Sequence, residues 1–357
     1  MKRGVYHLFA CLATIGATIG CQEGSVLPPT APTPLPIDKV GQLTISCPAD
    51  AVAQSLNGVS ASVSYPPPQV GGGLDPVATD CVPPSGSSLP IGTSIANCTT
   101  TDVLGQRATC SFTATVLAPP QLGETRFLAF GDSITAGETS PSLFGSRLLE
   151  LLKSYPFKLE NRLREAYPVQ TITVVNAGLP GERVALGGVA RFSTQLTNIQ
   201  PQVALIMEGT NDLNYVAVPE SEIAAAIESM VIEAQGRGVD PILATIAPAR
   251  PYGESTFPVR IPILNDLIRG IAVGRGIPLV DVFAVINAGA CASSAPTLPC
   301  IGADNLHPTA EGYELIADAF FDVIVENYDV PVTSLSDADS NYPTASFGAT
   351  GGKGDRP

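Results

Sequence analysis

Four short polar motifs between residues 131 and 308 contain side chains that could act together in nucleophilic catalysis. They lie at residues 131–137 (GDSITAG), 176–182 (NAGLPGE), 208–212 (EGTND) and 304–308 (DNLHP). A serine hydroxyl becomes a strong nucleophile when an adjacent imidazole takes its proton, and a carboxylate can orient that imidazole through Nδ1. The motifs supply one candidate for each role, namely Ser133, His307 and Asp304.

The number of histidines limits what such a site can be. The sequence contains two, and His7 lies in an apolar N-terminal segment that we expect to be removed. His307 is then the one imidazole left, so a histidine-based site must use it. A metal site built from several histidines is excluded, and we expect neither a metal nor another cofactor. Taken singly, each motif is an ordinary turn sequence, so only its position in the fold can give it a role.

Apolar runs alternate with helical patterns between residues 124 and 329. Five runs have the length of buried strands, at residues 126–130, 171–175, 203–207, 241–246 and 279–282. Apolar residues recur at helical spacing between them: Leu148, Leu149, Leu152 and Leu159; Ile223, Ile227 and Ile232; Ile263, Leu267 and Ile271; Tyr313, Ile316, Phe320 and Ile324. This alternation predicts βαβ units and a parallel sheet covered on both faces.

The polar motifs follow the first three runs or precede the last helical pattern. In a parallel sheet, the reactive loops gather beyond the carboxyl ends of the strands. A serine in a strand-to-helix turn also lies near backbone N–H groups that can stabilise an oxyanion. We therefore expect the four motifs to meet at one edge of the sheet.

In this order the motifs resemble those of the SGNH hydrolases, the GDSL esterase and lipase family. The resemblance covers roughly residues 126–327. It implies a flavodoxin-like, three-layer α/β/α fold with a five-stranded parallel sheet. The Gly-x-Ser-x-Gly sequence of other α/β hydrolases does not surround Ser133, because Thr135 takes the place of its last glycine.

The resemblance also implies a role for each candidate residue. Ser133 would be the nucleophile of a carboxylic-ester hydrolase, His307 the general base and then acid, and Asp304 the residue that orients His307. The oxyanion hole would consist of the Ser133 and Gly181 backbone N–H groups and the Asn211 side chain, with Gly178 as the less favoured alternative to Gly181. The substrate would be an acylated small molecule, lipid or glycan.

Residues 38–118 have a different character, with short alternating runs at residues 42–46, 59–65 and 108–116. This pattern predicts an antiparallel β-sandwich. The residues around Cys47, Cys81, Cys98 and Cys110 resemble the HYR (hyalin repeat) module, which implies an immunoglobulin-like domain with a spacer or adhesive role and a surface partner. Four cysteines allow three pairings, and the sequence does not choose among them.

The N-terminus has the pattern of an export signal. Two basic residues precede an apolar stretch, and small residues before Cys21 resemble the lipobox of bacterial lipoproteins. We expect a signal peptide over residues 1–20, a lipid on Cys21 and a proline-rich tether over 21–37, which would anchor the protein to the membrane of the cell envelope or surface. The alternative is an ordinary signal peptide with an incidental cysteine. Residues 330–357 lack any pattern and are expected to be disordered.

The cysteine count agrees with export. Apart from Cys11 in the signal and Cys21, six cysteines remain, which indicates three disulfides. Cys291 and Cys300 lie far in sequence from the other four, so we expect them to bond to each other. The catalytic domain would then span residues 124–329.

The amino-acid composition argues against one class of function, nucleic-acid binding. The net charge is −14, with 33 acidic and 19 basic residues, which disfavours a nucleic-acid partner. Two other functions stay open beside ester hydrolysis. An acyltransferase could use the same site to pass an acyl group to or from a glycan or lipid alcohol, and a non-catalytic adhesin could use the HYR-like module alone.

Overall fold

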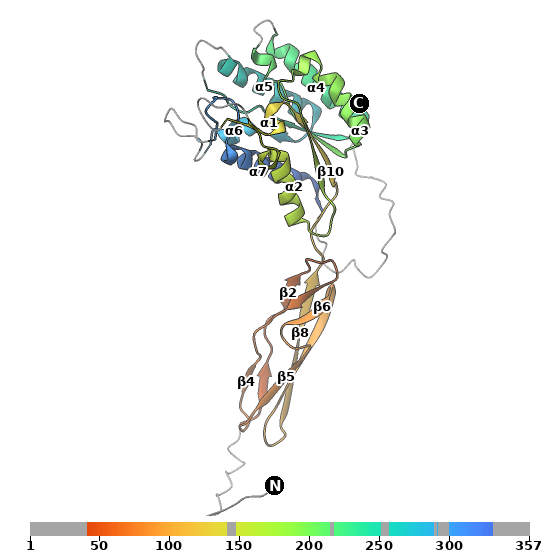
Figure 1. The fold of residues 1–357 in the computed structure, drawn as a ribbon. Helices are drawn as coiled ribbons and strands as arrows, with labels where there is room; N and C mark the ends of the chain where they lie inside the picture. Colours follow the sequence, from red (N-terminus) through yellow and green to blue (C-terminus); the bar gives the residue numbers. More distant parts are fainter. Residues whose placement is uncertain are drawn as a thin grey trace, which may run out of the picture.

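The computed structural model describes residues 41–140, 148–214, 218–250, 257–288, 291 and 300–330. The expected signal, Cys21 and tether, and nearly all of the expected tail, lie outside these ranges. A strand-rich region is followed by an α/β region, and the two lie at opposite ends of the picture in Figure 1. Within the described ranges, no helix is long and apolar enough to cross a bilayer.

Five strands form the central sheet of the α/β region. They are β13 (Thr173–Gly178), β10 (Arg126–Gly131), β14 (Val203–Met207), β15 (Asp240–Ala244) and β16 (Leu279–Val280), in this spatial order. All neighbouring strands are parallel. In chain order this is 2-1-3-4-5, the arrangement of doubly wound flavodoxin-like folds. The predicted fold class is therefore confirmed.

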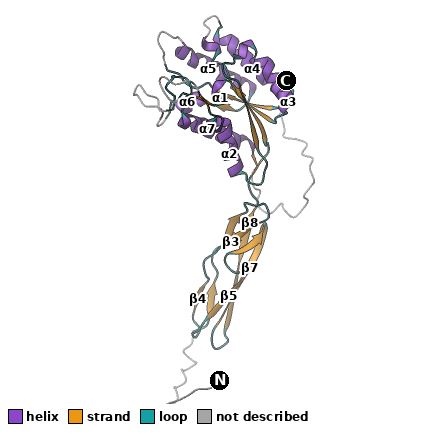
Figure 2. Cartoon of the chain, viewed as in Figure 1, coloured by secondary structure: helices purple, strands orange, loops and turns teal. Residues whose placement is uncertain are grey.

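Helices cover both faces of the sheet, as Figure 2 shows. One layer contains α2 (Tyr155–Ala166), α6 (Val282–Ile286) and α7 (Ala310–Tyr328), and the other contains α3 (Gly188–Ile199), α4 (Glu220–Gly236) and α5 (Phe257–Arg275). Strand β10 packs against both layers, because Phe127 belongs to the core under α2 and α7 whereas Leu128 and Phe130 belong to the core under α3 and α4. Adjacent side chains of a strand point to opposite faces.

Two helical expectations need correction. Helix α2 begins only at Tyr155, because Leu148–Leu149 is strand β12, which pairs with β11 (Glu138–Thr139), and Leu152 lies in the 3₁₀ turn η2 (Leu151–Lys153). In α5 the buried face is Ile261, Leu264, Ile268 and Ala272, whereas Ile263 is 53% exposed. Helix α5 has apolar residues on several sides, so apolarity alone did not identify the face that packs.

Other boundaries differ by a few residues. Strand β13 continues to Gly178, so the second polar motif begins inside the strand rather than after it. Strand β9 (Gln121–Leu122), which precedes residue 124, pairs with β17 (Asp329–Val330). The face of α7 formed by Tyr313, Ile316, Phe320 and Ile324 is buried, as its spacing predicts.

The strand-rich region contains eight described strands. These are β1 (Thr44–Ser46), β2 (Ala51–Gln54), β3 (Ser60–Val63), β4 (Gln69–Gly71), β5 (Ala78–Val82), β6 (Ser87–Pro90), β7 (Gly92–Thr101) and β8 (Arg107–Leu117). Its largest sheet has the order β2-β8-β7-β5, and because β2 runs parallel to β8, the region is not wholly antiparallel as expected. Disulfides join Cys47 to Cys110 and Cys81 to Cys98.

Candidate active site

Ser133 is the first residue of a short helix, α1 (Ser133–Ala136), that follows β10 directly. The Asp132 carboxylate caps this helix by accepting a hydrogen bond from the Ile134 N–H at 2.8 Å. Two glycines let α1 lie close to the sheet. A Cβ on Gly178 would fall 2.1 Å from the Ala136 nitrogen, and one on Gly131 would fall 2.0 Å from Thr135 Oγ1. The local sequence thus fixes the serine at the carboxyl end of β10.

The structure brings Ser133, His307 and Asp304 together in one hydrogen-bonded chain. His307 Nε2 lies 2.8 Å from Ser133 Oγ, and His307 Nδ1 lies 2.5 Å from Asp304 Oδ2. The imidazole is fully buried and Ser133 is 5% exposed. Burial acts to raise the pKa of Asp304, but hydrogen bonds from His307 outweigh it and the pKa lies below its usual value. Asp304 is therefore a carboxylate that can orient the ring.

The loop that carries Asp304 and His307 is closed at its base by backbone hydrogen bonds. The Thr309 N–H donates to the Cys300 carbonyl at 3.0 Å, and the Gly302 N–H donates to the His307 carbonyl at 2.7 Å. Within the loop, Asp304 Oδ1 accepts from the N–H of His307 at 3.0 Å. One carboxylate therefore holds both the backbone and the ring of His307.

Two backbone donors have no acceptor in the described part of the chain, namely the N–H groups of Ser133 and of Gly181 in the loop after β13. The Gly178 N–H instead donates to Asn176 Oδ1 at 2.9 Å, and Gly178 is needed for packing against α1. Gly181 has a φ of +77° and open space where a Cβ would lie. Of the two glycines, Gly181 has the N–H that is available to an oxyanion.

Asn211 approaches the same place from the loop after β14. Its Nδ2 donates to the Glu182 carbonyl at 2.9 Å and lies 3.5 Å from Asp132 Oδ2. A side-chain amide carries two N–H groups, so one donates to Glu182 and the other makes the longer bond to Asp132 at the cap of α1. The structure places Asn211 beside the Gly181–Glu182 loop and the cap of α1.

The model of the GDSL-like lipase/acylhydrolase family matches residues 129–315, just over half of the chain. The chain belongs to this family. No curated protein matches its sequence.

Solved structures similar to this GDSL-family chain include a lipase/acylhydrolase from Enterococcus faecalis, with 23% identity and a TM-score of 0.46 over 57% of this chain and 97% of the other. An acetylxylan esterase from Geobacillus stearothermophilus has 24% identity and a TM-score of 0.43 over 57% of this chain and 95% of the other.

An ion pair that the sequence patterns did not single out supports the site of this GDSL-family chain. Arg191 on α3 bonds to the carboxylate of Glu182, to the Ala177 carbonyl at 2.8 Å and to the Gly131 carbonyl at 3.2 Å. Its guanidinium also lies over the Phe130 ring at 4.0 Å from the centroid. One side chain thus joins the ends of β10 and β13 to the residue after Gly181.

Asp212 fastens the same loop from the other side. Its carboxylate accepts hydrogen bonds from the N–H groups of Val184 at 2.9 Å and Ala185 at 3.1 Å, at the start of the 3₁₀ turn η3 (Val184–Leu186). Asp212 itself begins the turn η4 (Asp212–Asn214). Burial raises the pKa of Asp212, against the hydrogen bonds it accepts. The two polar loops are therefore linked through a buried carboxyl group.

The capping residue Asp132 gives a stability prediction. Burial raises its pKa from 3.8 to about 6, although hydrogen bonds from Ile134 and Thr210 act in the other direction. A pKa above the unfolded value means that the folded protein loses stability as pH rises from about 4 to about 6. The Asp132→Asn variant lacks this carboxyl group and so lacks this pH-dependent loss. The difference in free energy of unfolding between variant and parent, measured in urea titrations, should therefore increase in favour of the variant by up to about 3 kcal/mol between pH 4 and pH 7.

A second helix cap provides the control of opposite sign. Asp281 caps α6, and although burial acts to raise its pKa, the Arg269 guanidinium and other donors lower it. A lowered pKa stabilises the folded protein above the unfolded pKa, so Asp281→Asn should lose stability relative to the parent as pH rises through that range. Equal pH dependence in the two variants would contradict the assignment for Asp132.

Cys291 and Cys300 are bonded to each other, as predicted. Cys300 is the residue whose carbonyl closes the base of the His307 loop. Replacing both cysteines with serine should lower the free energy of unfolding by roughly 2.5–3 kcal/mol on the chain-entropy estimate. It should also lower kcat well below the melting temperature, because a displacement of His307 by ~1 Å can cost ~10² in rate. An unchanged kcat would limit the disulfide to a structural role.

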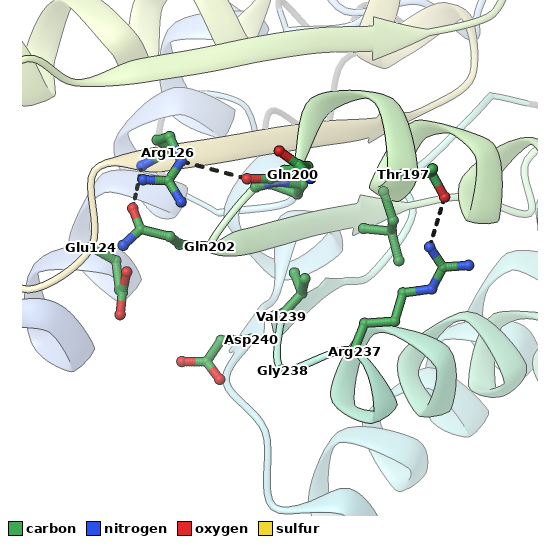
Figure 3. Close-up of a pocket in the computed structure, with 11 residues that line it drawn as sticks. Glu124, Arg126, Thr197, Gln200, Gln202, Arg237, Gly238, Val239 and Asp240 are labelled. Atoms are coloured by element: carbon green, nitrogen blue, oxygen red, sulfur yellow. Dashed lines mark hydrogen bonds between the residues drawn. The ribbon is translucent and has the colours of Figure 1, made fainter. Parts of the chain in front are cut away.

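A polar cavity of about 750 Å³ lies away from these residues (Figure 3). It is formed where β10, β14 and β15 begin, at the edge of the sheet opposite to Ser133. Its two arginines are engaged by neighbours, since Arg126 Nε bonds to the Gln200 carbonyl and Arg237 Nη1 bonds to Thr197 Oγ1. This cavity shares no residue with the candidate active site.

Proposed function

We propose that this GDSL-family chain is a serine carboxylic-ester hydrolase in which Ser133 is the nucleophile, His307 the general base and acid, and Asp304 the residue that orients His307. The observation that carries the proposal is the hydrogen-bonded chain from Ser133 Oγ through His307 to Asp304. It lies beyond the carboxyl end of β10, where ligands bind in doubly wound sheets.

The reaction begins with attack of Ser133 Oγ on the ester carbonyl carbon, while His307 Nε2 takes the hydroxyl proton. The carbonyl oxygen becomes an oxyanion. Its donors are the N–H groups of Ser133 and Gly181, and the Asn211 N–H that exchanges its long bond to Asp132 for the oxyanion. The tetrahedral intermediate then collapses and Nε2–H protonates the departing alcohol. Water, activated by the same imidazole, attacks the acyl-enzyme and releases the acid with Ser133 restored.

Turnover of p-nitrophenyl acetate by the purified chain tests this proposal, together with labelling by a fluorophosphonate. We expect ester hydrolysis and a single phosphonylated residue, Ser133, in the peptide map. Labelling elsewhere, or no hydrolysis of any short acyl ester, would contradict the proposal. If an added sugar or lipid alcohol captures most of the acyl group in place of water, the site is an acyltransferase instead.

We also propose that the protein is exported and held on a membrane by a lipid on Cys21, with the HYR-like region as a spacer or adhesive module. The sequence before Cys21 supports this proposal. Fractionation of expressing bacteria tests it, since Cys21→Ser should move the protein from the membrane to the soluble fraction. A parent protein already found in the soluble fraction would contradict lipid anchoring.

A further inference from the structure

A second carboxylate lies beside the catalytic imidazole. Glu138 Oε2 is 3.2 Å from His307 Nε2, the same nitrogen that lies 2.8 Å from Ser133 Oγ. Glu138 is not part of any role assigned above. Nε2 is the atom that must carry the proton during acyl transfer, so a carboxylate at this distance is placed to act on the reaction itself.

The Glu138 carboxylate oxygen is buried without a donor. Its side chain is 15% exposed, and Oε2 makes no hydrogen bond within the described part of the chain. A buried acceptor left without a donor is unfavourable, because it has lost its hydrogen bonds to water. In the resting site the Nε2 lone pair faces the serine hydroxyl, so the ring offers Glu138 no proton. The ring gains an Nε2–H only when it takes the proton of Ser133.

The backbone holds Glu138 in this position from two sides. Tyr313 Oη on α7 donates to the Glu138 carbonyl at 2.6 Å. Glu138 also pairs with Leu149 in the β11–β12 hairpin, and the Ala303 N–H of the His307 loop donates to the Ser140 carbonyl at 3.1 Å. The segment after α1 and the loop that carries His307 are therefore fastened together, and the carboxylate is not a freely moving surface group.

Carboxyl groups lie beside both nitrogens of the ring. Asp304 lies at Nδ1, Glu138 at Nε2, and Asp132 is near enough for His307 to act on its pKa. Tyr313, packed beside them on α7, has its pKa raised by burial and by Asp132, Glu138 and Asp304. A cationic ring in this setting has a carboxylate at each nitrogen.

We propose that Glu138 is a further catalytic residue, which accepts a hydrogen bond from Nε2–H of the His307 imidazolium during acyl transfer. This inference rests on the proposed ester hydrolysis. The Ser133 proton moves to Nε2 as the Oγ–carbon bond forms, and Nε2–H is then shared between the reacting oxygen and Glu138 Oε2. The proton passes to the departing alcohol as its bond to carbon breaks, and Glu138 stays a carboxylate throughout.

The test compares Glu138→Gln with Glu150→Gln in the full chain. Glu150 belongs to the same hairpin region and accepts from Thr139 Oγ1 at 2.8 Å, and no contact with His307 is found for it. We expect Glu138→Gln to lower kcat/KM roughly tenfold on the plateau, with KM little changed. Glu150→Gln should change neither.

A measurement without turnover separates failure of this inference from failure of the proposed function. The chain has two histidines, so the imidazole signals of the ¹⁵N-histidine-labelled protein are assigned by loss of one signal in His307→Gln. At acid pH we expect a downfield, slowly exchanging Hε2 of His307 that moves upfield in Glu138→Gln and stays in Glu150→Gln. No such proton in the parent, or the same shift in Glu138→Gln, would overturn the inference whether or not esters are hydrolysed.

Discussion

Replacing Ser133 with alanine is expected to lower kcat/KM for p-nitrophenyl acetate by at least about 10⁴-fold. The substitution removes only the hydroxyl that is proposed to attack the ester, and it leaves the proposed oxyanion donors in place. The fold should survive, because the helix cap comes from Asp132 and alanine is a good residue for the first turn of α1. Steady-state kinetics and thermal unfolding of the same preparation measure both effects.

Ser154→Ala is the matched control for this variant. Ser154 is also buried, but its hydroxyl donates to the Leu151 carbonyl at 2.6 Å and no contact with His307 is found for it. We expect its kcat/KM to stay within a few-fold of the parent. Turnover retained in Ser133→Ala, with the pH profile of the parent, would refute the assignment of the nucleophile.

The features of the site that depend on residues close together in the chain could be predicted from the sequence. Asp304 and His307 are three residues apart, and the Asp304 carboxylate reaches both the ring and the backbone of His307 within that loop. Ser133 follows an apolar run directly, so the strand-to-helix turn could be predicted from the alternation of patterns. Continuous apolar runs that alternate with helical patterns likewise predicted the five strands and their parallel direction, whereas their spatial order came from the structure.

Contacts between segments far apart in the sequence could not be predicted from residue type and spacing. Glu138 and His307 meet only because the β11 segment and the His307 loop pack together. Arg191 lies in a helix with ordinary amphipathic spacing, and nothing in that spacing shows that its guanidinium reaches Glu182 and two strand ends. Their roles depend on tertiary packing, which residue type and spacing do not specify.

One missed boundary did have a local signal. Ser154 and Pro156 frame the start of α2, and serine before a helix with proline in its first turn is a common N-terminal pattern. The apolar leucines before Ser154 were assigned to the helix because they match its period. Of these, Leu149 and Leu152 are in fact exposed, by 55% and 70%. Capping residues would have been the better guide here than periodicity.

Asn211→Ala is expected to lower kcat by about 10²–10³-fold with little change in KM. The amide would bind the oxyanion, which exists only in the transition state and intermediates, so its loss should leave ground-state binding of the ester nearly intact. Because Nδ2 also donates to the Glu182 carbonyl, part of the loss could come from movement of the Gly181 loop. Unfolding by urea, measured beside kcat, reports on that movement.

The control is Asn214→Ala, three residues on in the same turn. Asn214 is exposed, and its N–H donates to the Asn211 carbonyl at 3.3 Å, so its side chain can be removed without touching the oxyanion donors. A boronic acid that forms a tetrahedral adduct with Ser133 separates the two effects in Asn211→Ala. If Asn211 holds the oxyanion, affinity for the boronic acid falls in proportion to kcat, whereas affinity for the product acid does not. A parallel fall in both affinities would mean that the loop has moved and that Asn211 acts only through its bond to Glu182.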